Sequence, residues 1–168
     1  MKFKIGTSGE LKLADNEITE ILKEAYLDEG FIDLNKFKTS FSPASIRNRG
    51  VIYCAREIAS NEIAGMVIGV DYNSSAKLFA KTYEIEMHLL GVKPKFRNKG
   101  LAKLLIEELL ESVNNTGYTK MLLWTQVNMY TAHKLYKAYG FIHNPSRDFK
   151  RGDRDFLFFE KSLQETNS

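Results

Sequence analysis

The sequence has a single cysteine, Cys54, among its 168 residues. One thiol excludes an internal disulfide framework and a zinc site built from several cysteines, and the three histidines are scattered along the chain. Such a low thiol content fits the reducing environment of the cytoplasm. We therefore expect a cytoplasmic protein that holds no metal.

The sequence also lacks any apolar run close to the roughly 20 residues that span a bilayer. Its first residues, MKFKIGTSGELKLADNE, lack the apolar segment of a secretory signal, so we expect neither a signal peptide nor a membrane partner. The net charge is only +3, which permits an anionic ligand but is low for a nucleic-acid-binding domain.

What the sequence does have is the composition of one globular domain, with 43% hydrophobic and 27% charged residues. A chain of this length can bury a core without disulfide bonds. No repeat, low-complexity segment or linker divides it. We expect a single domain over residues 1–168, with a helical region at 1–50, a sheet-containing core at 51–161 and a frayed tail at 162–168.

Helical and strand patterns follow one another along this domain. Apolar residues recur at helical spacing after Asp15, the expected N-cap, and Ser42 followed by Pro43 predicts the start of a short helix. From Val51 onward come three β-rich runs, a helix, a strand, a shorter helix, a strand, a charged loop at 144–154 and a last strand. This order predicts a mixed α/β (α+β) domain with an antiparallel portion and one strand–helix–strand crossover.

The third β-rich run, KTYEIEMHLLGV, alternates between two kinds of residue. Apolar or aromatic side chains occupy positions 83, 85, 87 and 89, whereas Glu84, Glu86 and His88 lie between them. Because successive side chains of a strand point to opposite faces, we expect one apolar face and one face with titratable groups.

This run ends in a basic turn, VKPKFRNKG, which leads directly into an amphipathic helix. A helix N-terminus offers unpaired N–H groups and partial positive charge, which suit a phosphate. Gly100 would let a ligand approach the backbone closely, and Arg97 and Lys99 add positive charge. The turn is neither a Walker loop nor a GxGxxG fingerprint. From these residues alone, a phosphate site and a solvated basic loop both remain open.

Two motifs resemble those of the GNAT superfamily of N-acetyltransferases. VKPKFRNKGLA matches the pattern V-x-P-x-x-R-x-x-G-x-[GA] that opens the family's acetyl-CoA site, and AHKLYKAYGF matches the later pattern A-x-x-L-Y-x-x-x-G-F. The resemblance extends at motif level from Glu84 to Phe141. It implies a mixed, mostly antiparallel central sheet flanked by helices, with a strand–helix–strand core that binds acyl-CoA.

The resemblance implies that acetyl-CoA is the cosubstrate and that no metal takes part. Backbone N–H groups of the turn would hold the pyrophosphate, and a backbone N–H near Leu90 would polarise the thioester carbonyl. Asn128 lies one residue before the position of the family's usual asparagine and is a further contact. The cofactor-binding residues implied in this way are Leu90, Val92, Arg97, Asn98, Lys99, Gly100, Leu101, Ala102 and Asn128.

The implied reaction is direct attack of a primary amine, on a small molecule or a peptide, at the thioester. Tyr136 matches the family's general acid, and Glu86 matches the general base of some members, with His88 as its rival. The structural alternatives are that Tyr136 serves only the core and that Glu86 is an ordinary ion-paired strand residue. Residues 1–50 and the last strands would shape the acceptor pocket, and Arg147–Arg154 would be solvated or border its entrance. The acceptor is not identified, and the family is compatible with a homodimer.

Two other functions are open. A non-catalytic acyl-CoA sensor would keep the basic turn without working proton chemistry, against which Tyr136 argues. A nucleic-acid-binding module would use the patch from Lys93 to Lys99, against which the low net charge argues, so we expect no nucleic-acid partner.

Overall fold

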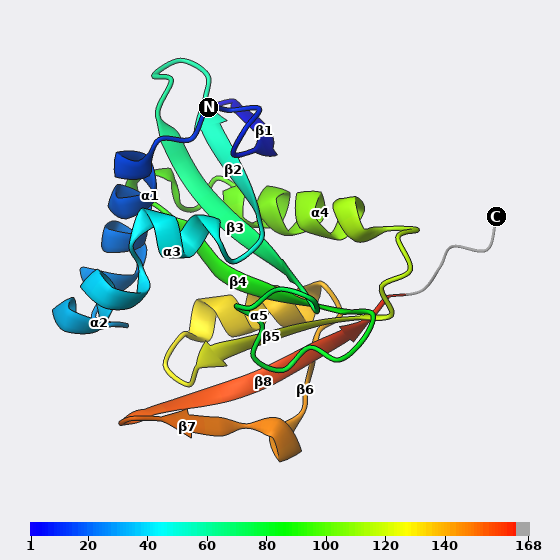
Figure 1. The fold of residues 1–168 in the computed structure, drawn as a ribbon. Coiled ribbons are helices and arrows are strands. Elements are labelled where there is room, and N and C mark those ends of the chain that lie inside the picture. Colours follow the sequence, from blue (N-terminus) through cyan, green and yellow to red (C-terminus); the bar gives the residue numbers. More distant parts are fainter. Residues whose placement is uncertain (164–168) are drawn as a thin grey trace.

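The structure is a computed structural model that describes residues 1–163. Its single sheet has the strand order β1-β2-β3-β4-β5-β8-β6, and β7 pairs with β8 (Figure 1). The strands are β1 (Phe3–Thr7), β2 (Val51–Glu57), β3 (Ile63–Asp71), β4 (Glu84–Val92), β5 (Lys120–Gln126), β6 (Ile142–His143), β7 (Phe149–Arg151) and β8 (Arg154–Ser162). Every pair is antiparallel except β4 and β5, which are parallel. The mixed, mostly antiparallel sheet is therefore confirmed.

Helices cover both faces of this sheet (Figure 1). They are α1 (Asp15–Leu22), the π-helix η1 (Lys23–Leu27), α2 (Leu34–Ser40), α3 (Pro43–Arg47), the 3-10 turns η2 (Pro94–Phe96) and η3 (Pro145–Arg147), α4 (Leu101–Val113) and α5 (Tyr130–Ala138). The first four pack with Met66 and Ile68 of β3 into one core, while α4 and α5 pack with Val67 into another. Because β3 is buried on both faces, its sequence is apolar almost throughout.

The strand–helix–strand crossover β4–α4–β5 contains the feature on which the site depends. Only three residue pairs join the two parallel strands, from Glu84↔Lys120 to Glu86↔Leu122. Beyond them, β5 continues to pair with β8, but β4 and β5 no longer pair. Strand β4 is also irregular at Leu89, whose φ is 50°, and its register with β3 shifts there. The predicted alternation of β4 therefore breaks at Leu89.

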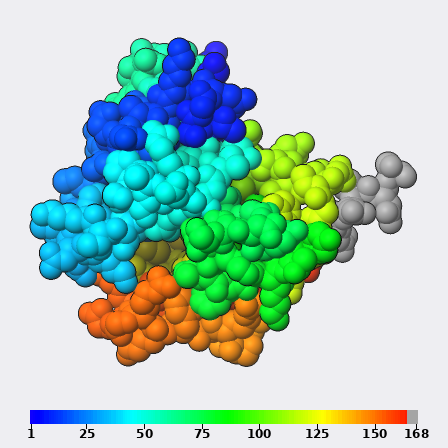
Figure 2. All heavy atoms as spheres, in the orientation of Figure 1, coloured from blue at the N-terminus to red at the C-terminus, as the bar shows by residue number. Residues whose placement is uncertain are grey.

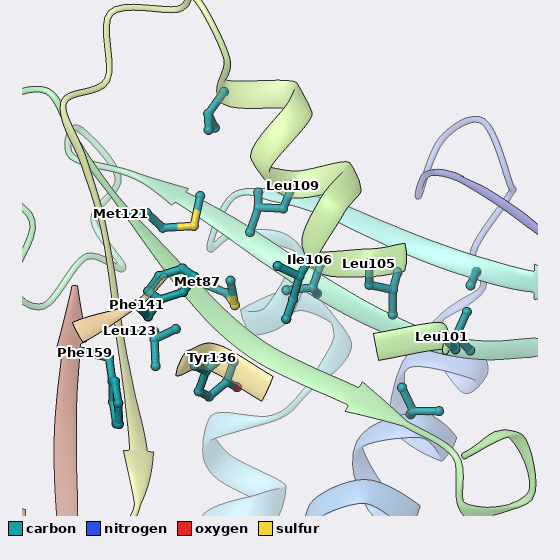
Figure 3. Close-up of a cluster of buried hydrophobic side chains, with 14 of the residues drawn as sticks. Met87, Leu101, Leu105, Ile106, Leu109, Met121, Leu123, Tyr136, Phe141 and Phe159 are labelled. Atoms are coloured by element: carbon teal, nitrogen blue, oxygen red, sulfur yellow. The ribbon is translucent and has the colours of Figure 1, made fainter. Parts of the chain in front are cut away.

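The core between α4 and the sheet holds the second motif in place. Helix α4 buries its apolar stripe against the sheet, as its amphipathic pattern predicts. The ring of Tyr136, from α5, lies among these side chains (Figure 3) and packs against Phe141 and Phe159. The same tyrosine thus ties α5 to the sheet.

Residues 1–50 are not only helical, as predicted, because the chain begins with the edge strand β1. This strand was missed because it is short and mostly half-buried, so it shows no clear apolar alternation. Helix α1 has Ala14 rather than Asp15 as its N-cap, one residue earlier than predicted. The start of α3 is confirmed: Ser42 is the N-cap, its hydroxyl accepts from the N–H of Ser45, and Pro43 follows.

The charged loop predicted at 144–154 contains strand β7, whose Phe149 stacks on Phe156 of β8 with ring centroids 5.0 Å apart. Three residues next to a glycine turn are too few to show a strand pattern. The predicted tail begins too early, since Ser162 ends β8, and residues 164–168 of that tail lie outside the described residues. Within 1–163, no helix has both the length and the apolar character needed to cross a membrane.

Candidate active site

The basic turn forms the start of α4 without a capping side chain. Gly100 is the N-cap residue, with φ 75° and ψ 10°, a left-handed conformation that favours glycine. A Cβ atom added there would meet no other atom within 4 Å, so the space beside the turn is open. No side chain caps the helix, so its first N–H groups, which lack intrahelical partners, remain available to a ligand.

Most of the positive charge of this turn is already paired. Lys93 and Lys95 both contact Glu62, at 2.9 and 2.5 Å, and the Arg97 guanidinium lies 2.7 Å from Glu29. The fourth cation of the turn, Lys99, has no ion pair within the described part of the chain. The free N–H groups are therefore the feature of this turn best suited to an anion, and the Arg97 guanidinium instead holds the turn to the segment that follows η1.

A cavity of about 520 Å³ runs from this turn to Tyr136, and we call it the cofactor cavity. It is lined by eight of the nine predicted cofactor residues: Leu90, Val92, Arg97, Asn98, Gly100, Leu101, Ala102 and Asn128. Lys99 does not line it. An uncapped helix N-terminus at one end and an unpaired edge of β4 along its side fit an elongated ligand with a phosphate group.

A second cavity, of about 700 Å³, lies between α2, α3, the 75–78 loop, β4, β5 and the β7–β8 hairpin, and we call it the acceptor cavity. In Figure 2 it opens as a hollow between the cyan, green and orange segments. The two cavities share five lining residues: Tyr26, Phe31, Leu90, Met129 and Tyr136. They therefore meet at the stretch of β4 that β5 has ceased to pair.

Tyr136 is placed for both of its predicted roles. Its ring is 8% exposed and belongs to the core, yet the residue also lines both cavities. Burial raises the pKa of its hydroxyl above the ordinary value, so the group is protonated at neutral pH but is a weaker acid than an exposed tyrosine.

Tyr26, which its helical spacing predicts only as a core residue, is a member of the site. It lies on η1, a π-helix, and its hydroxyl donates a 2.9 Å hydrogen bond to the carbonyl of Leu90 at the junction of the cavities. The glycine at position 91 permits this packing, because a Cβ there would lie 3.2 Å from Ala25. No apolar spacing distinguishes such a π-helix from an ordinary helical turn.

Glu86 contacts His88, so the two titratable groups of β4 share a face as predicted, but Glu86 is buried on that face. It has no exposed surface, and its carboxylate accepts hydrogen bonds from the N–H groups of Leu78, Phe79 and Ala80 and from Nε2 of His88. Burial alone would raise the pKa of Glu86, but these hydrogen bonds outweigh burial and hold the pKa below its ordinary value. The carboxylate is thus ionised and fully engaged.

His88 lies between Glu86 and the acceptor cavity, and it lines that cavity whereas Glu86 does not. Its Nε2 is 2.8 Å from the Glu86 carboxylate and its Nδ1 is 3.1 Å from Nη1 of Arg49. Burial lowers the pKa of His88, although Glu86 acts in the opposite direction, so the ring is neutral at neutral pH. These partners assign the proton to Nε2 and leave the Nδ1 lone pair toward Arg49.

Cys54 has no place in this site. It is fully buried in β2 on the other side of the sheet from α4, it lines neither cavity, and burial raises its pKa to about 11. Across residues 1–163, no group of three or more His, Cys, Asp or Glu side chains could hold a metal ion.

The model of the acetyltransferase (GNAT) family matches residues 15–141. The chain belongs to the GNAT family. Human N-acetylaspartate synthetase is 32% identical over 84 residues, which make up 50% of this chain and 27% of that protein. An uncharacterized N-acetyltransferase of Dictyostelium discoideum is 33% identical over 79 residues, or 47% of this chain and 37% of that protein. The chain thus spans less than two fifths of either relative.

Solved GNAT structures share the fold over nearly the whole chain. The PaiA N-acetyltransferase of Thermoplasma acidophilum, in complex with coenzyme A, has a TM-score of 0.70 at 17% identity, covering 97% of this chain and 100% of that one. A Bacillus subtilis acetyltransferase, also in complex with CoA, has a TM-score of 0.67 at 18% identity with the same coverage. At these identities the likeness confirms the GNAT fold and nothing finer.

Among the described residues, the two GNAT motifs contribute only Tyr136 to the acceptor cavity. The family match ends at Phe141, before β7 and β8 contribute Arg151 and Arg154 to its wall. Arg49, at the end of α3, also lies outside both motifs. Residues 1–50, the last strands and 147–154 were expected to shape or border an acceptor pocket, and Arg49, Arg151 and Arg154 of this wall come from those segments.

Proposed function

We propose that this GNAT protein transfers the acetyl group of acetyl-CoA to a primary amine by direct attack. The observation that carries the proposal is the meeting of the two cavities at Leu90 and Tyr136. A donor in one cavity and an acceptor in the other would face each other there without a covalent enzyme intermediate. Such an arrangement supplies the proximity that turns a bimolecular reaction into an effectively intramolecular one.

Acetyl-CoA would bind along the cofactor cavity. The N–H groups at the start of α4 would hold the pyrophosphate, and the free edge of β4 at Leu90 and Val92 would bind the pantetheine arm. Bound there, acetyl-CoA supplies an acetyl group activated as a thioester. Tyr26, by binding the Leu90 carbonyl, fixes the backbone at this point.

Two side chains would handle the protons. As the amine nitrogen bonds to the acetyl carbon and the carbon–sulfur bond breaks, Tyr136 would protonate the departing thiolate. His88 would take the proton lost by the amine at Nδ1, after exchange of its hydrogen bond to Arg49, while Glu86 holds Nε2–H in place. We prefer His88 to Glu86 as the base because only His88 lines the acceptor cavity. Glu86 as the direct base stays a prediction. The three backbone N–H groups and His88 that already donate to its carboxylate disfavour this role.

The alternatives gain no support from the geometry. The patch proposed for nucleic acid is largely neutralised, since Lys93, Lys95 and Arg97 are all ion-paired. A sensor without chemistry would have no need of a second cavity that reaches Tyr136. The human relative, by its name, makes N-acetylaspartate, so an amino acid is one candidate acceptor for this chain. A cytoplasmic location stays a prediction from the single cysteine.

Thermal unfolding with and without acetyl-CoA, followed by an amine panel, tests the proposal. A ligand at 100 times its dissociation constant stabilises the folded state by about 2.7 kcal/mol, which raises the melting temperature by roughly 5–10 °C in a chain of this size. Amine-dependent release of the CoA thiol should accompany this shift. A shift without release for any amine supports the sensor, and the absence of both refutes the proposal.

A further inference from the structure

The arginines of this chain fall into two groups. Four of the seven pair with a carboxylate: Arg47 with Asp15, Arg56 with Glu17, Arg97 with Glu29 and Arg147 with Glu160. For Arg49, Arg151 and Arg154, no carboxylate oxygen of residues 1–163 lies within 4.0 Å. All three of these line the acceptor cavity.

The wall of the acceptor cavity therefore carries charge of one sign. Lys36 adds a fourth cation, and no aspartate or glutamate of residues 1–163 lines the cavity. The whole chain has 24 basic and 21 acidic side chains, so this imbalance reflects their placement and not a general excess of cations. The carboxylate nearest along the hydrogen-bond network is that of Glu86, which is separated from Arg49 by the ring of His88.

The polar contacts of Arg49 and Arg154 orient these two side chains without neutralising them. Arg49 donates to the carbonyl of Ser40 and to His88, and Arg154 donates to the side-chain oxygen of Gln126 at 2.9 Å. Burial, and to a smaller extent the charge of Arg151, lowers the pKa of Arg49. Arg49 and Arg154 are half-buried and Arg151 is exposed. Because a partly desolvated guanidinium without an anion is unfavourable, an anion that arrives with the ligand would best satisfy this group of cations.

We propose that the acceptor amine also carries an oxyanion, and that Arg49, Arg151 and Arg154 bind it. The planar fork of a guanidinium matches a carboxylate or a phosphate in two parallel hydrogen bonds. Arg49 contacts His88, and Arg49 and Tyr26 both pack on the ring of Phe41, so the oxyanion would bind beside the junction of the cavities. An α-amino acid carries its carboxylate one carbon from the amine and is the acceptor class that this arrangement favours. The inference rests on the proposed acetyl transfer.

The remaining wall indicates what the rest of the acceptor is like. Phe31, Phe41, Trp124 and Phe156 line the same cavity, and Trp124 packs edge-on to His88 with ring centroids 5.0 Å apart. Aromatic walls bury apolar groups and leave a charged head to the arginines. The combination favours an α-amino acid with an apolar or aromatic side chain over a polyamine, which the cations would repel.

Matched pairs of amines that differ by one oxyanion test the proposal. The pairs are L-phenylalanine with phenethylamine, L-aspartate with β-alanine, and O-phosphoethanolamine with ethanolamine, and putrescine serves as a cationic amine. In at least one pair, we expect kcat/KM to be at least tenfold higher for the member that has the additional oxyanion. A preference in a carboxylate pair indicates a carboxylate site, and a preference for O-phosphoethanolamine indicates a phosphate site. Equal or better use of the partner in every pair, or preference for putrescine, overturns the inference while leaving acetyl transfer intact.

Equilibrium binding to the protein–CoA complex separates this inference from the proposed reaction. Calorimetric binding of an oxyanion-bearing amine at least tenfold tighter than its partner supports the arginine cluster even if no acetyl group is transferred. If no such amine binds and none is acetylated, the inference is overturned.

Arg151→Gln is the best variant because, in the described chain, the Arg151 side chain makes no hydrogen bond or ion pair, only a ring contact with Phe149. Arg47→Gln is its matched control, an arginine outside both cavities that is paired with Asp15. We expect Arg151→Gln to raise KM for the oxyanion-bearing acceptor about tenfold. KM for the matched amine and for acetyl-CoA should not change. The double variant, which combines Arg151→Gln with Arg154→Gln, is measured in the same way. If the ratio of KM between the two amines of a pair is unchanged in both the single and the double variant, the cluster's role is refuted.

Discussion

Replacing Glu86 by glutamine isolates the buried network behind the acceptor cavity. The carboxylate receives hydrogen bonds from three backbone N–H groups and from His88, and it has no exposed surface. An amide in its place turns a donor toward these donors, so at least one buried N–H loses its acceptor. Breaking a buried charged network costs about 3–5 kcal/mol, which corresponds to a fall in melting temperature of roughly 10 °C for a chain of this length.

The control is Glu84→Gln, two residues earlier on the same strand. Its carboxylate accepts one exposed hydrogen bond, from the N–H of Lys81, so we expect a change within about 1 kcal/mol. Urea or thermal unfolding followed by circular dichroism measures both variants. If the unfolding free energy of Glu86→Gln is also within about 1 kcal/mol of the wild-type value, the four hydrogen bonds do not stabilise the fold as proposed.

The pH dependence gives this prediction a second arm. Because the folded-state pKa of Glu86 lies below the ordinary value of 4.5, its stabilising effect is complete above that pH. The effect is lost as the pH falls through the lower, folded-state pKa. The difference in unfolding free energy between wild type and Glu86→Gln should therefore be constant near neutral pH and shrink in acid. A difference that grows on acidification contradicts an ionised Glu86.

Three further predictions concern the junction and the cofactor turn. Gly100→Glu should weaken acetyl-CoA binding at least tenfold by calorimetry, because it places a carboxylate where the phosphate would bind. The control is Gly117→Glu, at another glycine with a positive φ and open space, which should leave binding unchanged. Tyr136→Phe should lower kcat by about 10²-fold or more, the range of general acid catalysis, with little change in KM. The control Tyr139→Phe, at a tyrosine outside both cavities, should have no effect, and equal rates for the two variants would exclude Tyr136 as the general acid. Tyr26→Phe keeps the ring but deletes the hydroxyl that binds β4, so we expect lower kcat with unchanged stoichiometry of acetyl-CoA binding, and full activity would exclude a positioning role.

The cofactor half of the site could be predicted from the sequence because its signals are local. Gly100, the turn before it and the apolar stripe of α4 lie within one stretch of chain, and the left-handed residue is a glycine. The resemblance to the GNAT motifs supplied the nine cofactor residues, and eight of them line one cavity.

The acceptor half could not be predicted because it is assembled from distant segments. Arg49 and Arg151 meet one cavity only after α3 and the β7–β8 hairpin fold over the sheet, and β7 is too short to recognise. The alternation of β4 predicted a face with titratable groups for Glu86, but it could not show that the 78–80 loop covers this carboxylate. The irregularity at Leu89, which ends that alternation, leaves no trace in the residue pattern.

The central claim is that an acetyl group passes from acetyl-CoA to an amine at the junction of the two cavities. The direct measurement uses acetyl-CoA labelled with ¹³C in the acetyl group, an acceptor amine from the matched pairs, and mass spectrometry of both products. The account predicts one labelled acetyl group on the amine for each free CoA thiol, with at least a 10²-fold lower rate in Tyr136→Phe. Thiol release without labelled amine, or labelled amine formed equally fast without the protein, would contradict it.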